Sequence, residues 1–421
     1  ASRALPREAH ILPPPSLASE QAVPFSPTTA SSIPQGSPSS ASTLPTPAGG
    51  DRVRELMNLP WKVVPGQACS RADWEKDWER RGVRAALTGA TQRELKDIEV
   101  EFGEGDITYK VVIHNAPQYH LMRHWLCGDD LNFARSIHRS AAIKPQGGKS
   151  RAGFFESHDH RFWLKVITKS QELKALTSQA EAFFWYADKV LFDKLPSVLT
   201  QVVGVFTVSI TNNKSKASVG KPKTYLVQRN LRLNLLNRPH WLFDLKGVKS
   251  RRAGADAVAA NDAEGSDEED RSSRSLEEEG LKRKPKQDIV FWDQNFREWA
   301  GGKPLCLASH DLKYLEAAVW NDTHFLTAKT LVDYSFFVVA VFPEVCGTST
   351  DPWVSAATPG TLSVGIIDYL RQYKAAEYFE HKAKTLKGPE QPTVIRPEDY
   401  AARFRDSMST YFVADTPSDS Q

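Results

Sequence analysis

The sequence has few cysteines, no long apolar run and no basic leader followed by an apolar stretch. Its four cysteines (Cys69, Cys127, Cys306, Cys346) are scattered without a CxxC pair, which argues against a disulfide framework or a structural zinc site and favours a reducing, cytosolic setting. The longest apolar stretch, residues 336–342, is far shorter than the ~18 to 20 residues of a membrane-spanning helix. Because the chain begins with Ala and lacks a secretory signal, we expect a C-terminal piece of a longer protein.

The composition is that of a globular chain with a polar N-terminal tail. The 421 residues are 40% hydrophobic and 25% charged, with a mean hydropathy of −0.44, and at ~150 residues per domain they allow two or three units. Residues 1–50 hold 10 of the 26 prolines and 10 serines but only four charged side chains. Such a stretch cannot bury enough apolar surface to offset its ordering entropy, so we predict a disordered linker there.

A second polar break lies inside the chain. Residues 253–280 contain ten acidic and two basic residues and no aromatic residue, which predicts a solvated insertion. Without this segment of net charge −8, the formal charge of the chain rises from +3 to +11. A basic folded part suits an anionic partner such as nucleic acid, a phosphoinositide membrane or a nucleotide, although the same charge also suits plain solubility.

The hydrophobic pattern predicts an α+β fold in which strands and helices alternate in blocks. Alternating and apolar stretches predict strands over 98–102, 107–113, 202–210, 225–228, 336–342 and 361–367, with a hairpin over 153–167. Helical spacing predicts helices over 73–87, 171–192 and 312–320. The aromatic run Phe183 to Tyr186 is interpreted as helix packing in the core.

A glycine-rich stretch followed by a strand lysine indicates a phosphate site. Gly147, Gly148 and Gly153 permit close backbone approach to a phosphate. Lys165 ends a predicted strand twelve residues after Gly153, where its ammonium could bind phosphate oxygens. A P-loop would require glycine at position 143, which is Ile143, so the pattern is that of a kinase-style glycine-rich hairpin with a strand lysine. An ordinary hairpin is the alternative.

Two further short motifs could carry phosphoryl-transfer chemistry. In Phe243-Asp-Leu-Lys-Gly247, the aspartate could accept a hydroxyl proton and the lysine could neutralise a phosphoryl group. In Gly365-Ile-Ile-Asp-Tyr369, a carboxylate ends a strand and would suit Mg²⁺. The stretches 321–326 and 333–335 are interpreted, on their own, as capping and turn residues between a helix and a strand.

In this order, the motifs resemble the catalytic domain of the phosphatidylinositol phosphate kinases, from about residue 98 to residue 412. The matching segments are Gly-Gly-Lys-Ser at 147–150, Asp-x-Arg-Phe-x-x-Lys at 159–165, Gly-Val-Phe at 204–206, Phe-Asp-Leu-Lys-Gly at 243–247, Asn-Asp-Thr-x-Phe-Leu at 321–326, Asp-Tyr-Ser at 333–335, Gly-Ile-Ile-Asp-Tyr-Leu at 365–370 and Pro-Thr-Val-Ile-x-Pro at 392–397. The Gly-Gly-Lys-Ser and Pro-Thr-Val segments are more similar to the phosphatidylinositol-3-phosphate 5-kinase branch than to the others.

The resemblance implies a bilobal fold distantly related to protein kinases, with an antiparallel sheet in the N-lobe and a mixed C-lobe. It also implies ATP and Mg²⁺ as cofactors and the 5-hydroxyl of phosphatidylinositol 3-phosphate as acceptor, on the cytoplasmic side of an endosomal or vacuolar membrane. The segments expected are a linker over 1–50, a helical segment over 51–95, an N-lobe over 96–230, a C-lobe over 231–415 with a disordered insertion over 253–285, and a tail over 416–421.

The resemblance also assigns roles to individual residues. Asp244 would orient or deprotonate the inositol hydroxyl, Lys246 would stabilise the γ-phosphoryl group, and Asp368 would bind Mg²⁺. The residues expected to hold ATP are Gly147, Gly148, Lys149, Ser150, Gly153, Lys165 and Glu172. Those expected to face the lipid or the membrane are Arg252, Arg371, Lys374, Lys382 and Lys384.

Some positions depart from the family pattern. A lysine pair of the activation segment is replaced by Glu377 and Tyr378, the serine after Asp-Leu-Lys-Gly is Val248, and a glycine after Asp-Tyr-Ser is Val339. A catalytically weak scaffold that binds membrane or partner proteins, and a kinase for another phosphoinositide, therefore remain open as alternatives. A nucleic-acid binder is not expected, because the interleaved aromatic and basic pattern of such domains is missing.

Overall fold

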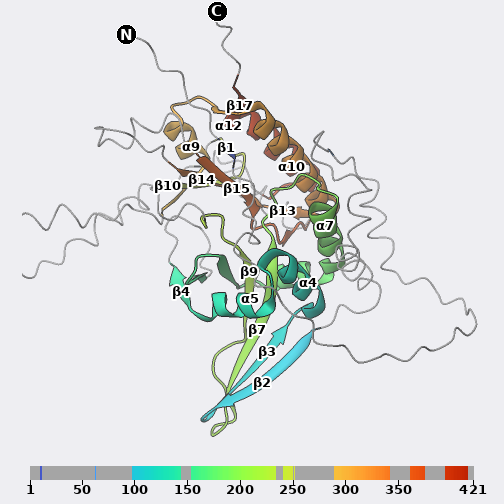
Figure 1. The fold of residues 1–421 in the computed structure, drawn as a ribbon, viewed down its shortest axis with the longest axis vertical. Helices are drawn as coiled ribbons and strands as arrows, with labels where there is room; N and C mark the ends of the chain where they lie inside the picture. The colour runs from blue at the N-terminus through green and yellow to red at the C-terminus, as the bar shows by residue number, and fades with distance from the viewer. Residues whose placement is uncertain are drawn as a thin grey trace, which may run out of the picture.

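The structure is a computed structural model, which describes residues 10–11, 62, 97–143, 153–233, 240–249, 251, 289–341, 361–374 and 394–415. In these ranges helices and two large sheets are mixed, which confirms the α+β class (Figure 1). The helix expected over 73–87, the acidic insertion and the linker, apart from residues 10–11, lie outside the described residues. Within the described ranges, no helix combines the length and hydrophobicity needed to cross a bilayer.

The first sheet is antiparallel and has eight strands. In spatial order its strands are β2 (Ile98–Glu104), β3 (Ile107–Ile113), β7 (Val202–Asn212), β9 (Lys223–Arg229), β6 (Phe162–Ile167), β5 (Phe154–Ser157) and β4 (Ser140–Ile143), and β8 (Ala217–Ser218) pairs with β7. The hairpin expected over 153–167 is confirmed as β5 and β6. Figure 1 shows the β2–β3 hairpin and one end of β7 extending away from the other elements.

Four helices accompany this sheet: α4 (Ala116–Cys127), α5 (Asp130–His138), α6 (Ser170–Ser178) and α7 (Ala180–Phe192). The single helix predicted over 171–192 is two helices, because the chain leaves helical geometry at Gln179, whose φ and ψ are −116° and 11°. In α7 the side chains of Phe184, Trp185 and Tyr186 are buried, which confirms the packing role expected for this aromatic run.

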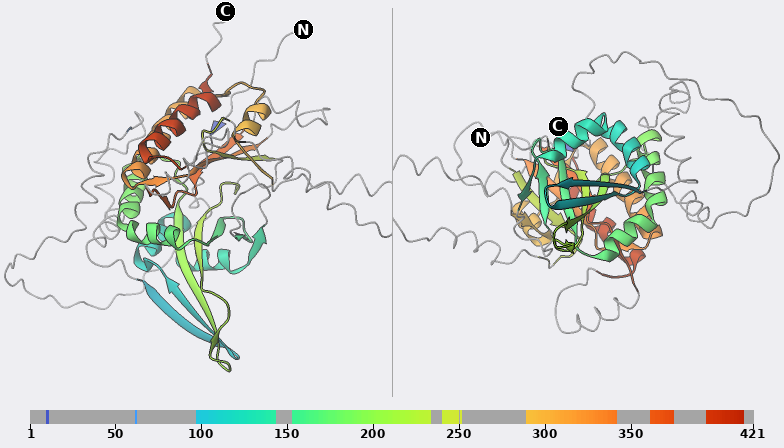
Figure 2. Two further views of the ribbon diagram at one scale, coloured as in Figure 1. Left: turned by 180° about the vertical axis from the view of Figure 1, so that it is seen from behind. Right: turned by 90° about the horizontal axis from the view of Figure 1, so that it is seen from below.

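The second sheet is mixed. Its spatial order is β1 (His10–Ile11), β15 (Thr361–Ile367), β14 (Ser335–Val341), β10 (His240–Leu245) and β11 (Val290–Phe291), with the β1–β15 and β10–β11 pairs parallel. Two short ladders pair β12 (Leu305–Leu307) with β17 (Phe412–Ala414) and β13 (Leu331–Val332) with β16 (Arg371–Gln372). The helices are α9 (Asp293–Trp299), α10 (Ser309–Ala328) and α12 (Pro397–Tyr411); Figure 2 shows α10 and α12 side by side.

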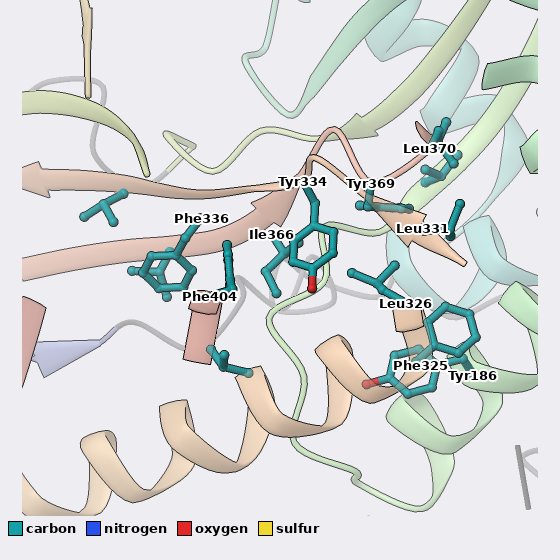
Figure 3. Packing of buried hydrophobic residues seen from close by; sticks show 14 of the residues in the cluster. Tyr186, Phe325, Leu326, Leu331, Tyr334, Phe336, Ile366, Tyr369, Leu370 and Phe404 are labelled. Atoms are coloured by element: carbon teal, nitrogen blue, oxygen red, sulfur yellow. The ribbon is translucent and has the colours of Figure 1, made fainter. Parts of the chain in front are cut away.

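The core of this second part lies between α10, α12 and the sheet (Figure 3). Phe336 and Ile366 come from β14 and β15 and are fully buried, as is Phe404 of α12. The rings of Tyr186 and Phe325 stack at 4.3 Å between centroids, which joins α7 of the first part to α10 of the second. Burying several aromatic side chains together stabilises the fold through apolar area and ring contacts.

The prediction for residues 321–326 is wrong. They are neither caps nor turns but lie inside α10, which runs to residue 328, and Asn321, Asp322 and Thr323 are fully buried. Asn, Asp and Thr have low helix propensity because their side chains compete for the backbone. Here tertiary hydrogen bonds satisfy them: Asp322 accepts from the hydroxyls of Tyr186 and Ser197, each at 2.6 Å.

Candidate active site

The strand order of the second sheet brings three motifs to one edge. Strand β14 is antiparallel to both β10 and β15, with Asp244 opposite Phe337 and Ser335 opposite Ile367. The C-terminal ends of β10 and β15 therefore lie beside the N-terminal end of β14. As a result the aspartates at 244, 333 and 368, which are far apart in the sequence, meet at the same edge.

The first sheet contributes a lysine to this edge. Lys165 lies on β6 between Phe154 of β5 and Leu226 of β9, and its side chain is mostly buried. Its Nζ is 2.7 Å from Oδ1 of Asp368 and 3.7 Å from Oε2 of Glu172 on α6. Burial opposes the charged ammonium, but the two carboxylates outweigh it and raise the pKa of Lys165 above its ordinary value. Lys165 thus links the two sheets as a permanent cation.

At this edge Asp333 binds two cationic side chains. Its Oδ1 accepts from Nζ of Lys246 at 2.7 Å, and its Oδ2 accepts from Nη1 of Arg371 at 2.8 Å. Burial favours the neutral acid, yet Lys246 and Arg371 outweigh it and lower the pKa of Asp333. Both Asp333 and Asp368 adopt left-handed backbone conformations, with φ of 63° and 58°. Non-glycine residues held in this region cluster at functional sites.

Asp244 is paired with an arginine seven residues further along the chain. Arg251 donates to both carboxylate oxygens, at 3.2 and 3.3 Å, and to the backbone oxygen of Asp244 at 2.7 Å. Burial works against its charge, but Arg251 and then Lys246 lower the pKa of Asp244. The lysine of the Asp-Leu-Lys-Gly motif forms an ion pair with Asp333. The two charged residues of the motif therefore have different partners.

The backbone of the loop that carries Lys246 is hydrogen-bonded to the buried carboxylate of Asp293. Asp293 is fully buried and accepts hydrogen bonds from the backbone N–H groups of Lys246 and Val248 at 3.0 and 3.1 Å. The turn needs glycine at 247, because its φ is 70° and an added Cβ would lie 3.0 Å from Oγ of Ser407. These contacts fix the direction in which Lys246 leaves the loop.

The remaining predicted residues fall into two groups. Gly153 leads into β5, Arg371 belongs to β16, and Lys374 is exposed just after it. The other predicted residues lie outside the described residues: Gly147, Gly148, Lys149, Ser150, Arg252, Lys382 and Lys384. The substitutions Glu377 and Tyr378 lie outside them too, whereas Val248 and Val339 are buried in the core.

The residue that sequence reasoning missed is Asp333. Its motif is predicted to be a turn and contributes to the family resemblance, but neither interpretation gives its carboxylate a role in the site. One signal points to it: a charged residue three positions before the long apolar run of β14, matched by Asp368 directly after the apolar run of β15. Antiparallel pairing of those two runs would have placed both carboxylates at one end.

The donor set at this edge fits a magnesium ion that is shared with phosphate oxygens. Asp368 is 37% exposed, and among the described residues only its Oδ1 carries a hydrogen bond. Mg²⁺ keeps most of its waters and takes one or two carboxylates together with substrate phosphates. In the described ranges no group of three or more potential metal-binding side chains gathers, so the fit is to an ion shared with a phosphate rather than to an all-protein site.

Comparison with known proteins identifies the family. The model of the family described as Phosphatidylinositol-4-phosphate 5-Kinase matches residues 138–353 and 347–411. The chain belongs to the phosphatidylinositol phosphate kinase family. This confirms the resemblance drawn from the ordered motifs, and the residues described above at the charged edge all fall inside the matched ranges.

Relatives place the chain beside the 3-phosphate 5-kinases of the family. It is 30% identical over 318 residues to 1-phosphatidylinositol-3-phosphate 5-kinase FAB1A of Arabidopsis thaliana, covering 73% of this chain and 15% of the relative. It is 29% identical over 331 residues to 1-phosphatidylinositol 3-phosphate 5-kinase FAB1 of Saccharomyces cerevisiae, covering 77% and 12%. The human 1-phosphatidylinositol 3-phosphate 5-kinase is 27% identical over 322 residues, covering 75% and 13%. The chain thus spans between about an eighth and a sixth of the length of these relatives.

Proposed function

We propose that this chain is the catalytic part of an ATP-dependent lipid kinase that transfers the γ-phosphate to the 5-hydroxyl of phosphatidylinositol 3-phosphate. The names of its relatives support this substrate. The observation that carries the proposal is the charged edge, in which Lys165 and Asp368 from different sheets are 2.7 Å apart beside the Lys246–Asp333–Arg371 group. The division into an N-lobe over 96–230 and a C-lobe over 231–415, meeting at this edge, is part of the proposal.

Phosphoryl transfer needs positioning and charge neutralisation more than covalent catalysis. We assign Lys165, held by Asp368 and Glu172, to the phosphates of ATP, together with the glycine-rich stretch at 147–153. Lys246 is placed to balance the charge of the transferring group. Asp368 would hold Mg²⁺, which supplies charge neutralisation at the phosphate oxygens when it is bound.

Two carboxylates are candidates for the group that receives the proton of the inositol hydroxyl. The sequence motif proposes Asp244, and the geometry favours Asp333, because its carboxylate binds Lys246, the cation assigned to the transferring group, and it precedes β14 at the end where β15 leads into Asp368. In this assignment Asp244, whose carboxylate is paired with Arg251 instead of Lys246, is a positioning residue. Arg371 and exposed Lys374 are assigned to the anionic lipid surface, together with Arg252, Lys382 and Lys384, on the cytoplasmic face of an endosomal or vacuolar membrane.

The test is transfer of labelled γ-phosphate from Mg-ATP to vesicles that carry single phosphoinositides. We expect product from the 3-phosphate lipid, and a loss of about 100-fold or more for Asp333→Asn with the melting temperature preserved. Asp244→Asn should retain more activity than Asp333→Asn if Asp244 only positions the loop. The reverse order of the two variants would return the proton-accepting role to Asp244, and unchanged activity in both would exclude this edge as the active site.

The scaffold alternative makes a different prediction. It would bind vesicles without transfer to any phosphoinositide, either because it does not bind Mg-ATP or because it binds Mg-ATP without transferring the phosphate. Its motivation in the sequence includes Val248 and Val339, but both side chains are buried and point to packing rather than to loss of the charged edge. If only another phosphoinositide were phosphorylated, the proposed kinase activity would stand and the proposed substrate would be wrong.

A further inference from the structure

A hollow lies on the first sheet, away from the charged edge. It has a volume of about 640 Å³ and lies between α5 and the turn that joins β5 to β6. Its charged lining side chains are Arg135, His138, Arg139, His158, Asp159 and Arg161. The volume falls in the range of small-molecule sites, ~300 to 1,000 Å³. The hollow lies at the β5–β6 turn, whereas Gly153 and the glycine-rich stretch join the other end of β5.

The acid in this lining is already satisfied by the protein. Oδ1 of Asp159 accepts from the hydroxyls of Ser136 and Ser157 at 2.6 and 2.8 Å and from the backbone N–H of Arg161 at 3.2 Å. Burial disfavours its charge, but these hydrogen bonds prevail and lower the pKa of Asp159. The carboxylate thus holds the turn and also attracts Arg161, whereas within the described residues no ion pair is formed by Arg135 or Arg139.

A buried guanidinium behind the turn adds to the positive field. Arg229 on β9 is only 8% exposed; its Nη1 donates to Oε1 of Gln201 at 3.2 Å, and its buried Nη2 has no hydrogen-bond partner among the described residues. Burial and, to a smaller degree, the charge of Arg161 lower the pKa of Arg229 to about 10. Arg161 lines the hollow and Arg229 does not, so an anion bound to Arg161 would offset part of the positive charge that the two guanidinium groups share.

We propose that this hollow binds a small molecule that carries several phosphate groups, either free or as the headgroup of a lipid. Arginine guanidinium groups pair with phosphate oxygens through two parallel hydrogen bonds. Arg135 lies in the last turn of α5, Arg139 directly follows the helix as its C-cap, and both are exposed. Arg161, from the turn, faces the same space. The proposal is independent of the kinase activity, because none of these residues belongs to the charged edge.

Calorimetric titration with inositol hexakisphosphate, a compact polyphosphate probe, tests the site. We expect the double variant Arg135→Gln/Arg139→Gln to weaken binding about tenfold or more, since each charge-assisted hydrogen bond contributes strongly. The matched control is Lys216→Gln/Lys221→Gln, which removes the same charge from exposed positions between β7 and β9 and should bind as the unchanged chain does. Lys246→Met, which alters the charged edge, should also retain binding in the hollow.

Flotation of the chain with vesicles that contain or lack phosphatidylinositol 3-phosphate distinguishes a free polyphosphate ligand from a lipid headgroup. If the arginine variant loses only the titration signal, the ligand is a free polyphosphate; if it loses only lipid-dependent flotation, the ligand is a headgroup. Equal weakening by the lysine control would show non-specific attraction and overturn the site. Undiminished binding of the arginine variant in both assays, with its circular dichroism preserved, would overturn it as well.

Discussion

The ammonium of Lys165 and the carboxylate of Asp368 lie 2.7 Å apart although 203 residues separate them in the sequence. One side chain comes from a strand of the antiparallel sheet and the other from the end of a strand of the mixed sheet. The pair is a direct ionic link between the two sheets. It places a permanent cation beside the carboxylate assigned to Mg²⁺.

Removing the cation should abolish phosphate transfer while leaving the chain folded. Lys165→Met keeps the length of the side chain but leaves Asp368 and Glu172 without their shared partner. We expect phosphate transfer to fall about 100-fold or more, and Mg-ATP binding, measured by calorimetry, to weaken. Lys174→Met on the exposed side of α6 is the control and should behave as the unchanged chain does. Equal activity of the two variants would contradict the role of Lys165.

The buried acid behind the loop should matter for stability. Asp293 accepts from Lys246, Val248 and the hydroxyl of Tyr411 through Oδ1 and contacts Arg251 through Oδ2. Asp293→Ala leaves these donors unpaired and should lower the free energy of unfolding by about 3 kcal/mol or more. Asp293→Asn retains an acceptor oxygen and should cost less. Chemical denaturation measures both; equal costs would show that the charge, not the acceptor, is what the loop requires.

Asp322 should give the stability a pH dependence of unusual sign for an acid. Burial raises its pKa from 3.8 to about 7, despite hydrogen bonds from Ser197, Tyr186 and the backbone N–H of Val198. Between these two values the folded chain binds a proton that the unfolded chain has released. The contribution of Asp322 to stability is therefore complete below about pH 4 and falls as the pH rises toward 7, by up to ~1.4 kcal/mol per pH unit.

The measurement is the free energy of unfolding at several pH values between 4 and 8. Other groups titrate in the same range, so the comparison is with Asp322→Asn, which cannot ionise. The unchanged chain should lose stability with rising pH more steeply than the variant does. Parallel curves would mean that Asp322 is ionised throughout.

The contact between Lys62 and α10 should be carried by the backbone. The N–H and C=O of Lys62 are hydrogen-bonded to the side-chain amide of Asn321 at 2.7 and 2.8 Å, and its Nζ lies 3.9 Å from the centroid of Trp320. Lys62→Pro removes the donor and should cost about 1–2 kcal/mol. Lys62→Ala loses only the cation–π contact and should cost about 0.5–1 kcal/mol.

Thermal unfolding compares the two Lys62 variants, and hydrogen exchange of α10 shows whether the contact is lost. Faster exchange around Asn321 is expected for the proline variant alone. If alanine were as damaging as proline, the side chain rather than the backbone would carry the contact.

Strands of the fold were predictable where their local pattern was clear. The hairpin of β5 and β6 is predictable because apolar residues on both sides of a polar turn favour two paired strands. The predicted strand 361–367 is β15 with the same bounds, and the predicted strand 336–342 is β14, which begins one residue earlier. The helices α4, α5, α9 and α12 were not anticipated. The C-terminal part of α10 was not predicted, because residues 321–324 are polar and disfavour a helix. The side chains of Asn321 and Asp322 are hydrogen-bonded to α7 and to residues 196–198, which are distant in the sequence.

The sequence by itself determined the order of the motifs, and with it the family, because an ordered set of short segments is recognisable without coordinates. It also determined which residue types are available for phosphate and Mg²⁺. Only the tertiary structure decided the partners: Lys246 pairs with Asp333, Asp244 with Arg251, and Lys165 with Asp368. The physical reason is that ion pairs form between side chains close in space, and the strand order of the two sheets, rather than distance along the chain, sets that closeness.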